Sequence, residues 1–550
     1  MPSSLNDFKM AEDGKGSPPT EHATKVTVDA ASVNPLVKDK VFNTFEILSL
    51  GYSVCNSWVG VAGALTIGLS QGGPALLIYG LWVCRPFPPF SQTWAPLTLF
   101  LPSSPFPLPH FRLFRLSSML MGLIILCVGL SLSELASVYP HAGGQYVYAA
   151  MLAPPSSRRI FAFVTGFANI AAWAVISASV AFLNAQFIMA AVYFSLGITI
   201  QRWHYFLTFQ GVNILGTLYV WLIAHRTPFI YQVGLYSSLV GFLVTLFGTC
   251  FGPAALHNHN SSDFVWTTLT NETGWSSSVI CFITGMVNVN YAYGGFDGAI
   301  HIAAESSDPR RDIPKALLGT VALGFFTTLA WIVGILYSAQ DTAAAAVSGS
   351  GVPYFDIVLQ SLTAKGGVYV VISIAMVNML VSLLACQHTS MRLIQAFAND
   401  GGLIGGKVIS REHEKYGSAG WALLFNSFWV FLIGCLYLAS TTVYQAIIGS
   451  TLILSHISYA IPVFLLMCRG RKLPQRPYIS LGAFGWIANA VTVIWAIIAL
   501  VFYSFPAGLP VTGTSMNYCS VVIAIVGLFG LANWLATKKH FAISGLMEEE

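Results

Sequence analysis

The sequence has very little charge. Only 9% of its 550 residues are Asp, Glu, Lys or Arg, against about 25% in an average soluble domain, and 55% are hydrophobic. So few charged side chains cannot hydrate the surface of a soluble protein of this length, and most of that surface must face lipid. The net charge of +4 is too small to indicate a nucleic-acid partner. The composition therefore predicts a polytopic protein whose main partner is the lipid bilayer.

Motifs for ATP hydrolysis and metal binding are also missing. The sequence contains no P-loop and no His-Glu-x-x-His pair, and no polar segment is long enough for a soluble catalytic domain. Its nine cysteines are scattered without the spacing of metal ligands, and most lie inside apolar runs. We therefore predict that the protein is not an enzyme, that it has no cofactor or metal, and that this chain alone is not an ATP-driven pump.

Apolar stretches long enough to cross about 30 Å of hydrocarbon recur from residue 45 onward. They predict an all-α fold with about twelve spans, because helices satisfy their own backbone polar groups in lipid. The expected spans are 45–69, 119–138, 160–194, 205–224, 229–252, 276–304, 315–339, 367–389, 419–438, 442–468, 483–505 and 516–537.

The spans divide into two halves of five, 41–252 and 253–468, followed by two further spans within 469–537. The polar residues 1–40 are expected to form a disordered cytosolic tail, and 538–550 a second cytosolic tail. Under this arrangement 21 Lys and Arg fall on the side of the two termini and only two on the opposite side. This bias predicts that both termini are cytosolic.

Segment 85–118 does not resemble its neighbours. Of its 34 residues, 8 are Pro, 6 Phe, 6 Leu and 5 Ser, and none is acidic. The prolines exclude a spanning helix. Our hypothesis is that the segment is translated intron, and the alternative is a real external insertion. Sequencing the message across these codons decides between the two.

The first and sixth spans are interrupted by small residues at mid-depth. Gly permits unwound backbone, which a membrane tolerates only where it lines a cavity or is buried in protein. Because both interruptions occupy the same position in their halves, they predict a binding site between two broken helices. The alternative is ordinary close helix packing on small residues. The candidate substrate-binding residues are Asn56, Ser57, Trp58, Val59, Gly60, Val61, Ala62 and Gly63 in the first span and Tyr291, Tyr293, Gly294, Gly295 and Phe296 in the sixth.

Two classes of substrate suit such a site. Exposed N–H groups of half-helices favour a carboxylate and freed carbonyls favour an ammonium, so a zwitterion fits. The aromatic rings of Trp58, Tyr291, Tyr293 and Phe296 could instead hold a quaternary ammonium such as choline. For each ring the alternative is core packing. The residues leave both substrate classes open.

Ionisable residues at membrane depth are costly and call for an explanation. Asp297, His301 and Glu305 follow the second interruption at i, i+4 and i+8, which places them on one helix face. They are candidates for a proton relay or an inner gate. The alternatives are an N-cap for Asp297 and a position at the cytosolic exit for Glu305. Glu134 is a further gating candidate, although it and Glu46 lie near span ends where a structural ion pair is the alternative.

Several motifs resemble the amino acid–polyamine–organocation permeases. Those that carry the resemblance are Asn56–Trp58, Ser133–Tyr146, Tyr293–Gly298, Asp312–Ala316 and Ala396–Gly402. Two late segments, Leu481–Gly485 and Pro510–Tyr518, are similar to the fungal branch that contains amino acid, γ-aminobutyrate and choline permeases.

The resemblance implies a fold of two inverted repeats of five helices, with helices one and six broken and two C-terminal helices added. It also implies transport by alternating access, with the proton as coupling ion, at the plasma membrane. We therefore expect a secondary-active permease for amino acids or related small amines such as γ-aminobutyrate. The alternatives are a permease for choline or another quaternary amine, and a nutrient sensor that does not transport.

Overall fold

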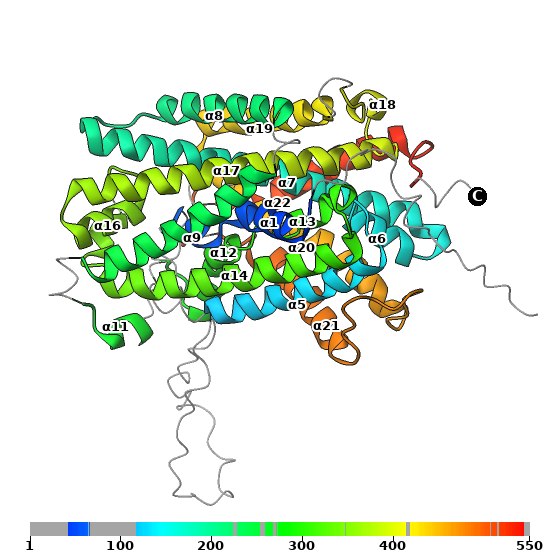
Figure 1. The fold of residues 1–550 in the computed structure, drawn as a ribbon, viewed down its shortest axis with the longest axis horizontal. Helices are drawn as coiled ribbons and strands as arrows, with labels where there is room; N and C mark the ends of the chain where they lie inside the picture. Colours follow the sequence, from blue (N-terminus) through cyan, green and yellow to red (C-terminus); the bar gives the residue numbers. More distant parts are fainter. Residues whose placement is uncertain are drawn as a thin grey trace, which may run out of the picture.

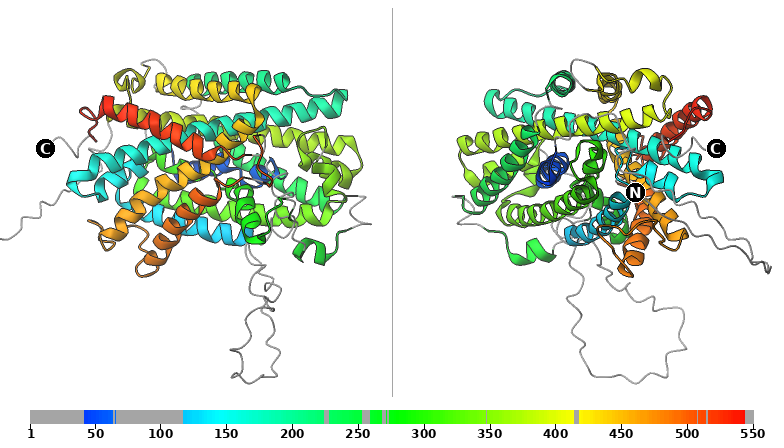
Figure 2. Two further views of the ribbon diagram at one scale, coloured as in Figure 1. Left: turned by 180° about the vertical axis from the view of Figure 1, so that it is seen from behind. Right: turned by 45° about the vertical axis from the view of Figure 1, so that its right-hand side comes forward.

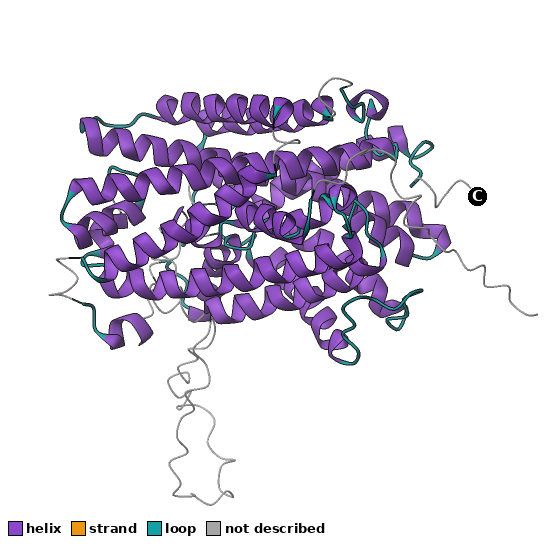
Figure 3. Cartoon of the chain, in the orientation of Figure 1, coloured by secondary structure: helices purple, strands orange, loops and turns teal. Residues whose placement is uncertain are grey.

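The computed structural model describes residues 42–63, 65, 117–223, 228–252, 259–267, 271, 273–346, 348–413, 418–506, 508–513 and 516–543. Within these residues every extended element is a helix, and an isolated bridge pairs Phe42 with Ser306 (Figure 3). The tail 1–40, residues 85–116 of the anomalous segment and the last seven residues lie outside this part of the chain. What the sequence predicts for these three segments therefore stays a prediction.

The expected spans coincide with helices, which confirms the all-α class. Ten spans are continuous helices: α5 (Ser117–Val138), α7 (Arg158–Leu196), α8 (Arg202–Leu222), α9 (Phe229–Cys250), α14 (Pro309–Ser338), α17 (Lys365–Asn399), α19 (Gly420–Ala439), α20 (Thr441–Cys468), α21 (Phe484–Phe502) and α22 (Cys519–Thr537). All of these except α8 are long and apolar enough to cross a membrane unaided.

The remaining two spans are interrupted, as the sequence predicts. The first consists of α1 (Thr44–Cys55) and α2 (Ser57–Gly63), and the sixth of α12 (Ser278–Tyr291) and α13 (Gly298–His301). The spans are joined in places by short helices: α6 (Gln145–Leu152), α11 (Ser262–Thr267), α15 (Thr342–Ala346), α16 (Pro353–Leu362) and α18 (Gly406–Ile409).

Helix packing follows the two halves of the chain. Corresponding helices lie against each other: α5 against α14, α7 against α17, and α8 against α19. Helix α7 packs against α20, the last helix of the second half. Its counterpart α17 likewise packs against α9, the last helix of the first half. This pairing agrees with the expected repeat of five plus five helices. The last two helices are peripheral, α21 on α20 and α5, and α22 on α20 and α7.

The first span lies in the middle of the bundle. Helix α1 packs between α9, α14 and α17, and two views show it surrounded by these helices (Figure 1, Figure 2). It starts with a capping box, in which the Asn43 side chain accepts from the backbone N–H groups of Phe45 and Glu46, and the Glu46 carboxylate accepts from the Asn43 N–H. From Ile47 to Cys55 most of its side chains are buried, so its broken end is delivered to the centre of the protein.

Candidate functional site

The break in the first span is made by one residue in the left-handed region. Asn56 has φ 35° and ψ 56°, a conformation that Asn adopts more readily than most residues. Its Oδ1 accepts a hydrogen bond from Ser238 Oγ of α9 at 2.8 Å. Its backbone N–H still donates to the Tyr52 carbonyl at 2.7 Å. The chain therefore turns sharply here while the end of α1 stays capped.

The break in the sixth span depends on a glycine. Helix α12 ends at Tyr291 and α13 starts at Gly298, with turns between them. Gly295 has φ 77°, and a Cβ on it would lie 2.7 Å from Val54 Cγ1 and 3.2 Å from Trp173 of α7. Only glycine meets both conditions without strain. The two breaks therefore approach each other closely.

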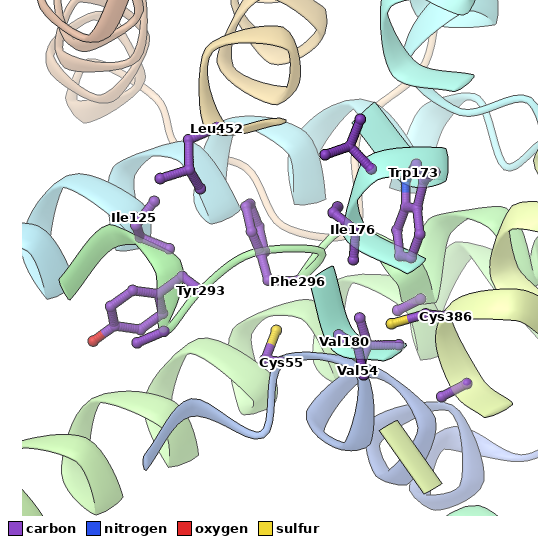
Figure 4. Packing of buried hydrophobic residues seen from close by; sticks show 14 of the residues in the cluster. Val54, Cys55, Ile125, Trp173, Ile176, Val180, Tyr293, Phe296, Cys386 and Leu452 are labelled. Carbon is purple, nitrogen blue, oxygen red and sulfur yellow. The ribbon is translucent and has the colours of Figure 1, made fainter. Parts of the chain in front are cut away.

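A pocket lies between the breaks. From the breaks it is lined by Val54, Cys55, Gly60, Tyr291 and Gly294; α7 adds Ile176, Ser179, Val180 and Leu183, α17 adds Met379 and Ser382, and α20 adds Thr451. In Figure 4, Val54 of the first break and Val180 of α7 lie side by side, whereas the ring of Tyr293 points away from them.

Sequence reasoning missed the lining from α7, α17 and α20. A signal was present in α7, where Ile176, Ser179, Val180 and Leu183 recur at i, i+3, i+4 and i+7 and so share a face. Nothing in that pattern says which neighbour the face meets. Only the packing of α7 against the broken spans decides it.

The pocket wall carries no charged side chain. Its polar groups are hydroxyls that already have partners. Tyr291 Oη donates to Ser179 Oγ, and Ser382 Oγ donates to the Val54 carbonyl at 3.0 Å. Thr451 Oγ1 donates to a carbonyl of α7 at 3.1 Å. Each of these hydroxyl oxygens keeps lone pairs for a further donor.

Helix ends set the electrostatics of the pocket. It is lined by the C-terminal residues of α1, which has 12 residues, and of α12, which has 14. Helix C-termini carry partial negative charge from their aligned peptide dipoles, and a carbonyl oxygen that already accepts one hydrogen bond, such as that of Val54 or Tyr291, keeps a second lone pair. The pocket is therefore suited to a positively charged group.

Most other predicted residues of the first span pack outside the pocket. Val59, Val61 and Ala62 are buried in the core, and a Cβ on Gly63 would lie 2.5 Å from a methyl group of Leu183. None of these four residues is part of the pocket lining. Ser57 is fully buried, and its Oγ lies 2.5 Å from the position of a Cβ on Gly324 of α14.

Trp58 also lies outside the pocket lining. Its Nε1 donates to Ser238 Oγ at 2.9 Å, and its ring centroid is 6.1 Å from that of Trp331 and 6.4 Å from that of Tyr354. Phe296 packs edge-on against Tyr459, with ring centroids 5.5 Å apart. Of the four aromatic candidates, the structure therefore places only Tyr291 on the pocket wall.

Asp297 and His301 meet in a buried polar network. Asp297 Oδ1 accepts from Tyr459 Oη of α20 at 2.7 Å, and Oδ2 accepts from Gln145 Nε2 of α6 at 2.8 Å. His301 Nε2 lies 3.3 Å from Asp297 Oδ2 and 3.3 Å from Asn169 Nδ2 of α7. Asp297 and His301 are both 0% exposed. The network thus joins α13 to three other elements.

Glu305 belongs to a different network. It ends the 3₁₀ turn η3 (Ala303–Glu305) and accepts from Arg392 Nε of α17 at 2.5 Å. Arg392 also donates to Gln395 Oε1 at 3.0 Å and lies 3.4 Å from Glu412. The structure therefore does not place Glu305 in contact with His301, although both follow the same break. This ion pair ties the end of the sixth span to the eighth.

Glu134 forms a structural ion pair. Its carboxylate lies 2.5 Å from Arg471, and both side chains are less than 10% exposed. It also accepts from the Leu481 N–H at 3.3 Å. Glu134 thus anchors the loop between α20 and α21 to the end of α5 and is not part of the pocket lining.

Comparison with known proteins identifies the family. The family model described as amino acid permease matches residues 113–529. The chain belongs to the amino acid permease family. The resemblance inferred from the sequence is thereby confirmed, and this permease is a multi-pass membrane transporter.

Curated relatives differ in their stated substrates. This permease is 32% identical to a choline transporter of Saccharomyces cerevisiae over 91% of its own length and 82% of that protein. It is 26% identical to a 7-keto 8-aminopelargonic acid transporter of the same yeast, over 92% and 94% of the two chains. It is 25% identical to the amino-acid permease BAT1 of Arabidopsis thaliana, over 91% and 92%. All three are named as transporters or permeases, and none of the names is that of an enzyme.

Proposed function

We propose that this permease carries a small organic cation, choline or a closely related amine, by alternating access. The observation that carries the proposal is the pocket at the C-terminal ends of α1 and α12, which has a tyrosine ring and hydroxyls on its wall and no charged side chain. Carbonyl ends and an aromatic face stabilise a quaternary ammonium without a fixed counter-charge. The choline transporter among its relatives supports this choice.

A zwitterionic amino acid is the second candidate. The observation that favours it is the start of α2 at Ser57, where the first N–H groups of a helix have no partner within the helix. Against it, the start of α13 is occupied by Asp297, whose buried carboxylate disfavours a second carboxylate nearby. A primary amine with a distant carboxylate, such as γ-aminobutyrate, falls between the two candidates.

We also propose that a proton is the coupling ion and that His301 receives it. His301 Nδ1 lies 2.9 Å from the Ala142 carbonyl, which can only accept, so Nδ1 carries a hydrogen. In neutral His301, Nε2 accepts from Asn169. When Nε2 gains a proton it must donate instead, and the Asp297 carboxylate stands at 3.3 Å to accept. One proton therefore exchanges a contact with α7 for an ion pair within the sixth span.

Four buried side chains lie in or around the contact between His301 and Asp297. Asp297 is the carboxylate in contact with His301, and Trp173 meets the His301 ring edge-on with ring centroids 5.8 Å apart. Tyr148 and Tyr459 are the buried phenols near Asp297.

In the cell, we propose that the permease works in the plasma membrane with both termini in the cytosol, as the Lys and Arg bias indicates.

Uptake in a yeast strain that lacks its own choline and amino-acid permeases tests the substrate. Labelled choline, γ-aminobutyrate and a neutral amino acid are supplied in turn to cells expressing the chain with and without residues 85–118. We expect saturable choline uptake that neutral amino acids do not inhibit. Uptake of neutral amino acids that choline does not inhibit would replace the cation proposal with the zwitterion.

A matched pair of tyrosines tests the site. Tyr291→Leu removes the ring on the pocket wall and should raise the KM for choline by about 10-fold to 30-fold, as expected for a cation–π contact of up to about 2 kcal/mol. Tyr291→Phe keeps the ring and should change the KM less. Tyr293→Phe is the control, because its hydroxyl is buried outside the pocket lining without a hydrogen-bond partner. Tyr293→Leu removes the ring at the control position, and a KM increase in Tyr293→Leu equal to that in Tyr291→Leu would refute the assignment.

Proton movement is measured separately, in proteoliposomes containing a pH-sensitive dye. We expect substrate-driven proton flux in the unaltered chain and its loss in His301→Gln, with substrate binding retained. Substrate-driven flux that persists in His301→Gln would remove His301 from the coupling step and leave the substrate assignment unaffected.

A further inference from the structure

We propose that this permease has a docking surface for the headgroup of an anionic phospholipid, at the end of the bundle where α14 starts. The surface, here called the basic surface, is formed by the first turns of α14 and the loop between α20 and α21. Arg311 and Lys315 are placed on it by their contacts with Tyr478, and Arg310, Lys472 and Arg476 are the further cations of these two segments. The proposal does not depend on which substrate is carried.

Two of these cations lie over one ring. Arg311 Cζ and Lys315 Nζ are each 5.9 Å from the ring centroid of Tyr478, and Tyr478 is 50% exposed. Arg311 and Lys315 are four residues apart on α14, where like charges repel each other. An anion bound between them would relieve this repulsion. The ring keeps the two cations together while leaving them accessible.

The cations of the basic surface have few carboxylate partners. None of its five cations forms an ion pair with a carboxylate of the described residues, and Arg310 Nε is buried without a hydrogen-bond partner. Asp312, in the first turn of α14, is engaged by Thr44 and Ser306. Asp308 is the exposed acid closest in sequence. Among the described residues of these two segments, Asp308 is thus the one exposed acid beside five cations, which leaves the surface positive.

The loop that carries part of the basic surface is held in place. Arg471 pairs with Glu134, and the Tyr478 N–H donates to Ser137 Oγ at 3.2 Å, so the loop is tied to the C-terminal end of α5. Figure 1 shows this loop, in orange before α21, at the same end of the molecule as that end of α5. A surface ordered before binding loses little entropy when a ligand binds.

Its position selects a lipid rather than a soluble anion. Pro309–Ser338 is a candidate membrane span, so Arg311 and Lys315 lie in its first two turns, at the depth of lipid headgroups. Exposed Phe484, Trp486 and Ile487 follow the loop directly and provide apolar surface for acyl chains. A phosphate with attached acyl chains contacts both features, whereas free phosphate contacts only the first.

Binding of short-chain lipids to the purified full-length chain tests the proposal. Thermophoresis compares dioctanoyl-phosphatidylinositol with dioctanoyl-phosphatidylcholine at fixed salt. We expect preferential binding of the anionic lipid. Because each Lys or Arg near a lipid surface contributes about 5-fold in affinity, the double variant Arg311→Gln/Lys315→Gln should weaken that binding by about 30-fold. The matched control is Arg202→Gln/Lys365→Gln, which removes two exposed cations on other segments.

Several results would overturn the proposal: equal affinity for the two lipids, no loss in the Arg311→Gln/Lys315→Gln variant, or an equal loss in the control. Full competition by inorganic phosphate would identify a soluble-anion site instead. If the first variant does not fold, Lys472→Gln/Arg476→Gln changes only the exposed loop and should still weaken anionic-lipid binding more than the control does.

Discussion

Substitution of Gly295 by Ala gives the sharpest test of the broken sixth span. The left-handed φ of 77° costs an L-residue about 1 to 2 kcal/mol, and the added Cβ would lie 2.7 Å from Val54 Cγ1. Overpacking of this kind typically costs about 1 to 3 kcal/mol. The conformation with both breaks in contact should therefore lose about 2 to 5 kcal/mol, which lowers its population at least about 30-fold.

The neighbouring glycine is a matched control. Gly294 has no left-handed φ, and the nearest atom to an added Cβ is the Tyr291 carbonyl oxygen at 3.3 Å. Gly294→Ala should therefore change stability by less than about 1 kcal/mol. Because Gly294 lines the pocket, uptake of both variants is compared at saturating substrate and divided by the amount of protein at the cell surface.

A second-site change separates the two parts of the effect. Val54→Ala removes the methyl group that the new Cβ would meet, so Gly295→Ala/Val54→Ala should recover the packing part and not the backbone part. We expect partial recovery of uptake. If Gly295→Ala transports as fast as Gly294→Ala, the left-handed turn is not required for transport and the reasoning is wrong.

Three further outcomes are expected. Asp297→Asn should reduce uptake per surface molecule more than Glu46→Gln does, because Asp297 is fully buried in the His301 network whereas Glu46 is half-buried; the reverse order would refute this. Glu134→Gln should destabilise the protein by about 3 to 5 kcal/mol, seen as a lower thermal midpoint, since it leaves a buried guanidinium without its counter-charge. Trp58→Phe should lower the thermal midpoint through its lost hydrogen bond and leave the choline KM unchanged, so a large KM increase would place Trp58 in the site after all.

Sequence reasoning predicted the broken helices but not the whole site. The glycines and small residues after Asn56 and Tyr291 revealed where two spans unwind, because few sequences can unwind inside a membrane. The same reasoning named Trp58 as a candidate site residue, with core packing as the alternative, and the structure packs its ring against Trp331. An aromatic side chain beside a break can turn toward the pocket or away from it, and the local sequence is the same in both cases.

For the charged residues, too, the local sequence predicted only part of the arrangement. The spacing of Asp297, His301 and Glu305 places them on one face only if the helix continues, whereas α13 ends at His301 and a 3₁₀ turn follows. Glu305 is thereby directed to Arg392, more than 80 residues away in the sequence. Spacing along a chain cannot report where a short helix stops.

The sequence by itself determined the membrane setting, the number of spans, the two breaks and the family, because hydrophobic length and backbone-permissive residues are local properties. The tertiary structure decided which faces of α7, α17 and α20 complete the pocket, that carbonyl ends of α1 and α12 meet there, and which partner each buried charge has. These depend on packing between segments far apart in the chain. No single segment encodes the side on which its neighbour will lie.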